Sequence, residues 1–296
     1  MARLPGPSAG SGAATGRAAV LVIGMHRSGT SAMTRVLNLM GGALPRKLKR
    51  GSGANEPGFW EGRTIVRTHE ALLESIGSSW DDVRELQAGW LELESTRAHE
   101  DALLELMRAD FSGAPIFVVK DPRVSRLVPL WLRLLGRFEA EPNFVIMVRH
   151  PLEVARSLAV RSRFDEEKSL RLWLIHELEA EQYSRGFPRV FVTYDRLLNE
   201  PEAVVAGVRD VLGVEWPAAA GDGEIRSFLS DEYRHHVEEA NMVGDGTDLR
   251  GWVREAYELA RRAADEESFD HDGSAAAFDE LGRRIRATYP GVASSS

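Results

Sequence analysis

The chain has 296 residues, of which 43% are hydrophobic and 28% are charged, and its formal net charge is −8. This composition is ordinary for a globular protein with a full hydrophobic core, and an acidic chain argues against general nucleic-acid binding and against adhesion to anionic membranes. Because the sequence contains no cysteine, disulfides, thiolate metal sites and cysteine nucleophiles are excluded.

The two ends of the chain differ from its middle. Residues 1–16 are rich in Gly, Ala, Ser and Pro and lack the apolar core of a signal peptide, so we predict a flexible N-terminal arm. Residues 17–290 are predicted to form a single domain, because the length suits one α/β domain with insertions better than two domains, and residues 291–296 are predicted to be a flexible tail. No run of 18 apolar residues exists, so we expect no membrane span. The absence of cysteine argues against a secreted disulfide scaffold, and we expect a cytoplasmic location.

Short apolar runs, nearly continuous and rich in β-branched residues, predict parallel strands that are covered on both faces. In chain order they are Ala19–Met25, Ile116–Lys120, Phe144–Val148 and Val190–Tyr194. Apolar residues at helical spacing predict helices at Gly29–Leu39, Arg63–Ile76, Thr96–Arg108, Ser125–Phe138, Leu152–Ala159, Glu167–Arg185, Pro201–Leu212, Leu249–Ala263 and Ala275–Ala287. Strands that alternate with helices indicate an α/β fold, a three-layer sandwich with a central parallel sheet.

The segment Gly24–Ser31 (GMHRSGTS) joins the first predicted strand directly to a helix. A glycine-containing loop in this position wraps an anionic group, because its backbone N–H groups point inward and the helix N-terminus favours negative charge. In a nucleoside-triphosphatase loop the position of Thr30 is a lysine that reaches the outer phosphates. Arg27 instead supplies a guanidinium from inside the loop, which suits phosphate or sulfate oxygens. The loop therefore predicts a P-loop-like phosphate cradle that differs from the usual ATP site.

A second anion site is predicted after the third strand. Arg149 follows this strand directly, and Ser157 lies eight residues later on the next predicted helix. Ligands of open α/β sheets bind outside the carboxyl ends of the strands, so both residues should lie near the Gly24–Ser31 loop. A surface ion pair is the alternative interpretation of Arg149.

These residues resemble those of sulfotransferases that use 3′-phosphoadenosine 5′-phosphosulfate (PAPS), and in particular those of a bacterial subgroup. The Gly24–Ser31 loop looks like the family's loop for the 5′-phosphosulfate, and Val148–Ser157 looks like the segment that grips the 3′-phosphate. Similar motifs are Asn55–Glu61 (NEPGFWE), Lys120–Arg123 (KDPR) and Tyr194–Leu198 (YDRLL). The resemblance covers roughly residues 18–215. The chain departs from the eukaryotic cytosolic enzymes, whose Arg-Lys-Gly-rich C-terminal loop it lacks; Arg234 is a weak replacement.

The resemblance implies a transferase that moves a sulfuryl group from PAPS to a hydroxyl, or an amine, of a small-molecule or glycan acceptor by in-line displacement. The product of the donor is PAP, and no metal is required. The implied cofactor-binding residues are His26, Arg27, Ser28, Gly29, Thr30, Ser31, Arg149, Ser157 and Tyr194.

Glu61 is our candidate for the general base. It follows a Pro57-Gly58 turn and the aromatic residues Phe59 and Trp60, which can shield it and raise its pKa. The resemblance implies the same role, because the protein-tyrosine sulfotransferases, which share a motif similar to Lys120–Arg123, use a glutamate from a similar region. The alternative is that Glu61 caps the following helix; Glu56 and His26 are further candidates for the base. Lys120, with Arg27, is our candidate for stabilising the leaving group, since a charge at the end of an apolar strand needs a partner or a ligand. The alternative for Lys120 is an ion pair with its neighbour Asp121.

The segment 46–50 contains four cations (Arg46, Lys47, Lys49 and Arg50) that can attract an anionic acceptor, although a solvated loop has the same composition.

Two alternative functions stay open. One is a P-loop nucleotide kinase or NTPase, against which Thr30 counts. A non-catalytic PAP- or PAPS-binding protein is the other, against which the presence of Glu61 and Lys120 counts.

Overall fold

The computed structural model describes residues 16–51, 58–217, 222–232, 247–265 and 271–288. The predicted arm (except residue 16), the predicted tail, Asn55, Glu56 and Arg234 lie outside these ranges. Among the described residues, no helix is long and apolar enough to cross a membrane.

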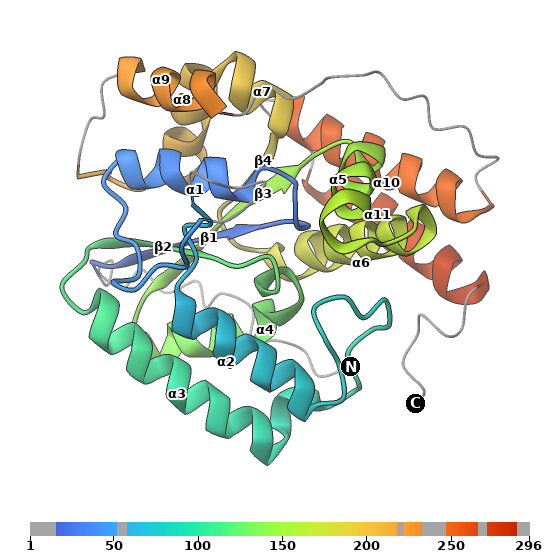
Figure 1. The fold of residues 1–296 in the computed structure, drawn as a ribbon, viewed down its shortest axis with the longest axis horizontal. Coiled ribbons are helices and arrows are strands. Elements are labelled where there is room, and N and C mark those ends of the chain that lie inside the picture. The colour runs from blue at the N-terminus through green and yellow to red at the C-terminus, as the bar shows by residue number, and fades with distance from the viewer. Residues whose placement is uncertain (1–15, 52–57, 218–221, 233–246, 266–270, 289–296) are drawn as a thin grey trace.

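A four-stranded parallel sheet forms the centre of the molecule (Figure 1). Its strands are β1 (Ala18–Ile23), β2 (Ile116–Lys120), β3 (Glu141–Val148) and β4 (Arg189–Thr193). Their order across the sheet is β2-β1-β3-β4, so β1 pairs with β2 on one side and with β3 on the other. The predicted strands are thereby confirmed, with small differences at their ends.

Helices cover both faces of the sheet, which confirms the predicted three-layer α/β fold (Figure 1). On one face lie α1 (Thr30–Leu39), α8 (Pro201–Leu212) and α9 (Asp222–Glu232). On the other face, or beside it, lie α2 (Arg63–Ser75), the short 3-10 helix η1 (Trp90–Glu92), α3 (Glu94–Phe111), α4 (Val124–Phe138), α5 (Pro151–Ser162), α6 (Glu166–Ser184), α10 (Leu249–Asp265) and α11 (His271–Thr288). Alternate side chains of β1 point into the two layers: Leu21 and Ile23 into one, Val20 and Val22 into the other.

Capping residues decide where several helices begin. Asp165 accepts a hydrogen bond from the Lys168 N–H at 2.7 Å and so starts α6. Pro151 occupies the first turn of α5, where its missing N–H costs nothing. Thr193 accepts from the Arg196 N–H at 3.3 Å, which starts the short helix α7 (Tyr194–Asn199) directly after β4. Tyr194, predicted as the last strand residue, is therefore the first residue of a helix.

Candidate active site

The predicted phosphate loop runs from the end of β1 to the start of α1, where Thr30 and Ser31 lie in the first turn. A Cβ atom on Gly24 would lie 2.5 Å from the Met147 carbonyl oxygen, and one on Gly29 would lie 2.3 Å from the ring of Tyr194. Both glycines also have positive φ angles, of 130° and 88°. The loop therefore needs glycine at these two positions, both for its backbone conformation and for its contacts.

Inside this loop the Ser28 hydroxyl is buried and has no hydrogen-bond partner among the described residues. Arg27, the preceding residue, adopts a left-handed conformation with a φ of 71°. Unpartnered buried hydroxyls are rare in proteins, and strained residues concentrate at binding sites. These two features indicate that the loop is shaped for a ligand rather than for its own packing.

The residues predicted for the second anion site meet this loop. The Arg27 Nε donates a hydrogen bond to the Ser157 Oγ at 2.8 Å, and the Arg149 Nη1 donates to the Arg27 carbonyl oxygen at 3.0 Å. The Arg149 guanidinium also lies 4.5 Å from the centroid of the Tyr194 ring. The structure thus brings together residues from the loop after β1, the end of β3, α5 and the start of α7. Arg149 also forms an ion pair, because its Nε donates to the Glu153 Oε2 at 2.8 Å, but this pair is largely buried and not the surface pair of the alternative interpretation.

Lys120, at the end of β2, has three hydrogen-bond acceptors around its ammonium group. These are the Glu61 Oε1 at 2.7 Å, the Ser31 Oγ at 3.0 Å and the Phe59 carbonyl at 3.1 Å. The side chains of Lys120 and Glu61 are only 2% and 4% exposed, so this is a buried ion pair. The pair brings together Glu61, the candidate base, and Lys120, the candidate for stabilising the leaving group. The bond from Lys120 to Ser31 connects both to the phosphate loop.

Two alternatives from the sequence are wrong. Lys120 does not pair with Asp121; the Asp121 carboxylate instead accepts from Arg123 at 2.8 Å and lies 2.8 Å from the His69 Nδ1. Although burial alone would raise it, Arg123 and His69 hold the pKa of Asp121 well below its usual range. Glu61 does not cap α2 either, because Gly62 occupies the cap position and no side chain makes a capping hydrogen bond there.

His26, also in the Gly24–Ser31 loop, has an environment that the sequence did not predict. Its ring is buried edge-on against Trp80, with 4.7 Å between the ring centroids, and its Nε2 has no hydrogen-bond partner among the described residues. Burial, followed by the charge of Arg123, lowers the pKa of His26 well below its usual value, so the imidazole is neutral at pH 7. Trp80 also stacks on Phe164, at 5.5 Å between centroids. No motif in the sequence marks Trp80.

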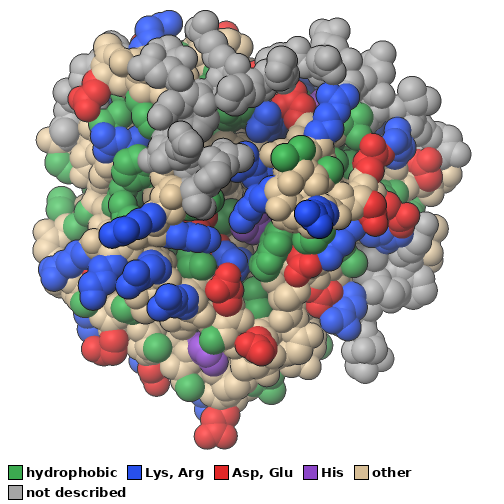
Figure 2. All heavy atoms as spheres, viewed as in Figure 1, with side chains coloured by type: hydrophobic (Ala, Val, Ile, Leu, Met, Phe, Trp, Pro, Cys, Tyr) green, Lys and Arg blue, Asp and Glu red, His purple; other side chains and the backbone are tan. Residues whose placement is uncertain are grey.

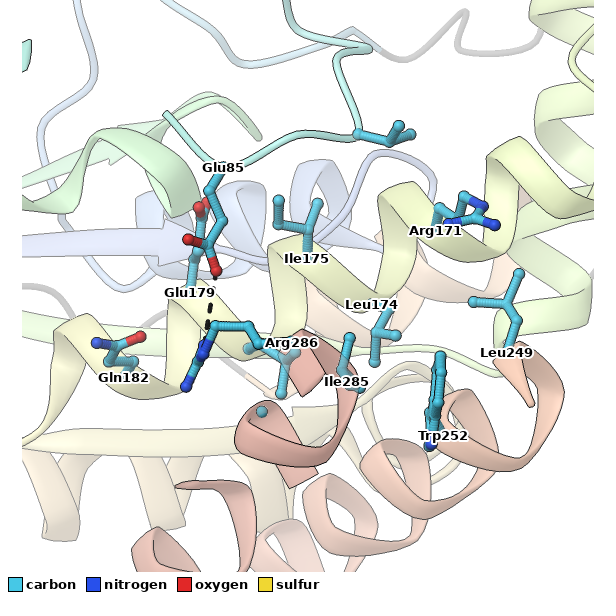
Figure 3. A pocket seen from close by; sticks show the side chains of 13 residues that line it. Glu85, Arg171, Leu174, Ile175, Glu179, Gln182, Leu249, Trp252, Ile285 and Arg286 are labelled. Atoms are coloured by element: carbon cyan, nitrogen blue, oxygen red, sulfur yellow. Dashed lines mark ion pairs between the residues drawn. The ribbon is translucent and has the colours of Figure 1, made fainter. Parts of the chain in front are cut away.

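A pocket lies apart from these residues, between α6, α10, α11 and the segment 83–85 (Figure 3). Its wall is mainly apolar, and Glu85 and Arg286 form an ion pair across it at 3.6 Å. Burial raises the pKa of Glu179 on its wall to about 7, although the nearby Arg126 opposes this shift. None of the predicted site residues lines this pocket.

Comparison with known proteins identifies the class. A family model described as the sulfotransferase family matches residues 19–218, and the chain belongs to this family. It is thereby assigned to enzymes that transfer sulfuryl groups, and the matched region contains every residue predicted for the site.

Two of the similar solved structures have the following match to this chain. The domain from the Synechococcus PCC 7002 olefin synthase has 18% sequence identity and a TM-score of 0.46, over 84% of this chain and 96% of that one. The domain from the curacin biosynthetic pathway has 15% identity and a TM-score of 0.41, over 74% and 79% of the two chains. No curated protein matches the sequence.

Proposed function

We propose that the protein uses PAPS as its sulfuryl donor and transfers the group to a hydroxyl, or an amine, of a small-molecule or glycan acceptor. The observation that carries this proposal is the contact of Arg27 with both Ser157 and Arg149. It links a phosphate loop to a second cationic group, and PAPS carries phosphate at two separate positions. A nucleotide that carries phosphate at only one position would occupy only one of these two anion sites.

The residues of the site fit such a donor. Backbone N–H groups of Ser28, Gly29, Thr30 and Ser31 would hold the 5′-phosphate, together with the unpartnered Ser28 hydroxyl. Arg149 and Ser157 would hold the 3′-phosphate, with the Tyr194 ring supporting the Arg149 guanidinium at 4.5 Å. His26 and Arg27, from the same loop, would also contact the donor. Bound PAPS would supply the activated sulfuryl group, and PAP would remain after transfer.

The chain's own residues supply the rest of the chemistry. Glu61 would take the proton of the acceptor hydroxyl, and Lys120 with Arg27 would stabilise the negative charge that grows on the leaving oxygen. Since Lys120 holds the Glu61 carboxylate at 2.7 Å, the proton acceptor and the stabilising cation keep a fixed separation. Such preorganised groups need little rearrangement during the reaction, which is the main source of electrostatic catalysis.

We also propose that residues 17–290 act as one domain. This is supported by a hydrophobic cluster that contains side chains of β1 and β3 together with side chains of α10 and α11. The C-terminal helices thus share their packing with the sheet that carries the site, although the family match ends at residue 218.

The donor is tested by calorimetric titration of the purified protein with PAP, beside ADP and beside ATP with magnesium. Tight PAP binding and weak ATP binding are expected, because Thr30 replaces the lysine that reaches the outer phosphates of a triphosphate. The reverse order would mean that the loop serves a nucleoside triphosphate. Transfer of labelled sulfate from PAPS to an acceptor panel then separates an enzyme from a protein that only binds PAP.

A further inference from the structure

The basic segment 46–50 is tied by its backbone to the residues around Glu61. The Lys49 N–H donates to the Glu61 carbonyl at 2.7 Å, and the Arg63 N–H donates to the Lys47 carbonyl at 2.8 Å. An antiparallel bridge lies between these two bonds. The segment is therefore held against the candidate base, and it is not a loop that extends alone into solvent.

Further cations join this segment from the start of α2. Together they form a surface that we call the basic patch: Arg46, Lys47, Lys49, Arg50, Arg63 and Arg67. All are exposed except the half-buried Lys49. Figure 2 shows lysine and arginine side chains gathered on this face, over the part of the chain that Figure 1 draws between α1 and α2.

The positive charge of the basic patch is poorly balanced. Within the described ranges, the one ion pair of the patch joins Lys49 to the Glu61 Oε2 at 3.7 Å. Several exposed arginines elsewhere do have carboxylate partners, as Arg108 does in Glu105 at 2.5 Å. Arg63 lies in the first turn of α2, where the helix dipole makes a cation unfavourable, and no acidic residue in that turn balances its charge. An excess of positive charge in a chain of net charge −8 therefore indicates a place for an anion.

We propose that the basic patch binds an anionic group of the acceptor and so brings the acceptor hydroxyl to Glu61. This inference rests on the proposed function, because an acceptor exists only if the site transfers a sulfuryl group. The chemistry that fits is a hydroxyl compound bearing a phosphate or a carboxylate, such as a sugar phosphate or a uronic acid. Arginine guanidinium groups match both anions with paired hydrogen bonds.

Lys49 connects the patch to the site. Its ammonium group lies 3.7 Å from the Glu61 Oε2 and 4.8 Å from the centroid of the Phe59 ring. Phe59 in turn presents its carbonyl to Lys120 at 3.1 Å. An anion on the patch would thus lie next to the Glu61–Lys120 pair, with one lysine between them.

The test uses three probes with one scaffold: glucose, glucuronate and glucose 6-phosphate. Their binding is measured by ligand-detected NMR on protein saturated with PAP, so that the nucleotide site is filled. We expect the anionic probes to bind more tightly than glucose, and added salt to weaken that preference. A difference between glucuronate and glucose 6-phosphate tells a carboxylate-bearing acceptor from a phosphate-bearing one.

The variant that tests the patch is Arg63→Gln/Arg67→Gln. It should weaken binding of the preferred anionic probe by about tenfold or more, the value for loss of a charge-assisted hydrogen bond. The control, Arg97→Gln/Arg108→Gln, removes the same charge from exposed positions of α3 and should leave binding unchanged. Thermal unfolding checks that both variants are folded.

Two results would overturn the inference: no preference for the anionic probes over glucose, or unchanged binding in the Arg63→Gln/Arg67→Gln variant. The PAP titration separates this failure from failure of the proposed function. If PAP binds but the anion preference is absent, the basic patch alone has been misassigned. If PAP does not bind, the proposed function is wrong and the inference falls with it.

Discussion

The ammonium group of Lys120 lies 2.7 Å from the Oε1 of Glu61, although 59 residues separate the two in the sequence. Both side chains are buried, so each neutralises the charge of the other in a place that water does not reach. Removing one partner of such a pair leaves an uncompensated buried charge, at a cost of about 3–5 kcal/mol. Any test of catalysis at these residues must therefore measure stability separately.

Glu61→Gln is expected to cut sulfuryl transfer by about 10²- to 10⁴-fold, the range for loss of a general base, while the Kd for PAP changes little. Steady-state turnover and calorimetry measure the two quantities. The matched control is Glu70→Gln, which removes a half-exposed carboxylate that pairs with Arg123 at 2.6 Å. A fully active Glu61→Gln enzyme would exclude Glu61 as the base.

The double variant Glu61→Gln/Lys120→Met separates folding from chemistry. Because it removes both charges of the buried pair, its free energy of unfolding should lie closer to that of the wild type than that of Lys120→Met alone. Its turnover should nevertheless stay as low as that of the worse single variant. Recovery of turnover together with stability would show that the pair is structural only.

Arg149→Ala and Ser157→Ala are each expected to weaken PAP binding by about tenfold or more, since each removes a hydrogen-bonding group from the proposed 3′-phosphate site. Ser157→Ala also removes the acceptor of the Arg27 Nε. Ser162→Ala, at the end of the same helix, is the control for Ser157→Ala. Unchanged PAP affinity in both site variants would refute the assignment of this site.

Gly29→Ala is expected to destabilise the protein and to abolish PAP binding, because the new methyl group would lie 2.3 Å from the Tyr194 ring at a φ of 88°. Gly136→Ala is the matched control: its Cβ meets no atom within 4 Å, and it lies inside α4. This control should be neutral or stabilise by about 0.5–1 kcal/mol. Thermal unfolding and PAP titration compare the two, and a Gly29→Ala protein that binds PAP normally would contradict the tight contact.

Glu177 on α6 should lower the stability of the protein as the pH rises from about 5 to 8, whereas the buried His26 and His176, whose pKa values are lowered, act in the opposite sense below about pH 6.5. Burial, with a smaller contribution from Glu181, raises the pKa of Glu177 on α6 from 4.5 to about 8. The unfolded chain loses this proton above pH 4.5, whereas the folded chain keeps it, so unfolding becomes more favourable by up to about 1.4 kcal/mol per pH unit.

Glu177→Gln should remove this contribution, so that its stability falls less with rising pH than that of the wild type, because an amide does not titrate in this range. Denaturant unfolding at several pH values measures the effect, and Glu167→Gln, exposed on the same helix, serves as the control. Parallel pH profiles for wild type and Glu177→Gln would show that Glu177 is not the group responsible.

Much of the fold follows from the sequence because the strands are buried on both faces. The middle of each is a nearly continuous apolar run, which differs clearly from the amphipathic helices between the strands. The start of β3 was placed too late, because its first three residues, Glu141 to Asn143, are not part of such a run. The end of β4 is harder to locate, since Tyr194 continues the apolar run and only the Thr193 hydroxyl marks the start of a helix. Helix α9 lacks a clear apolar period and was not predicted.

The site shows a similar division. Arg149 and Ser157 were predicted near the loop because ligands of parallel sheets bind at the carboxyl edge. The partner of Lys120 was not predicted, although its neighbour Asp121 was the obvious choice. Successive residues at the end of a strand point to opposite faces, so Asp121 turns toward His69 while Lys120 turns toward Glu61. Distant contacts of this kind leave no local pattern in the sequence.

The order of the sheet has a consequence for synthesis. β1 is made first, yet its neighbours in the sheet are β2 and β3, so that Ala18 pairs with Ile116 on one side and with Glu141 on the other. Until those residues leave the ribosome, an apolar strand has two open edges, which is the state most prone to pairing with other chains. Nascent chains that stop before β2 should aggregate or recruit chaperones, and the full-length chain should escape both once β3 has emerged.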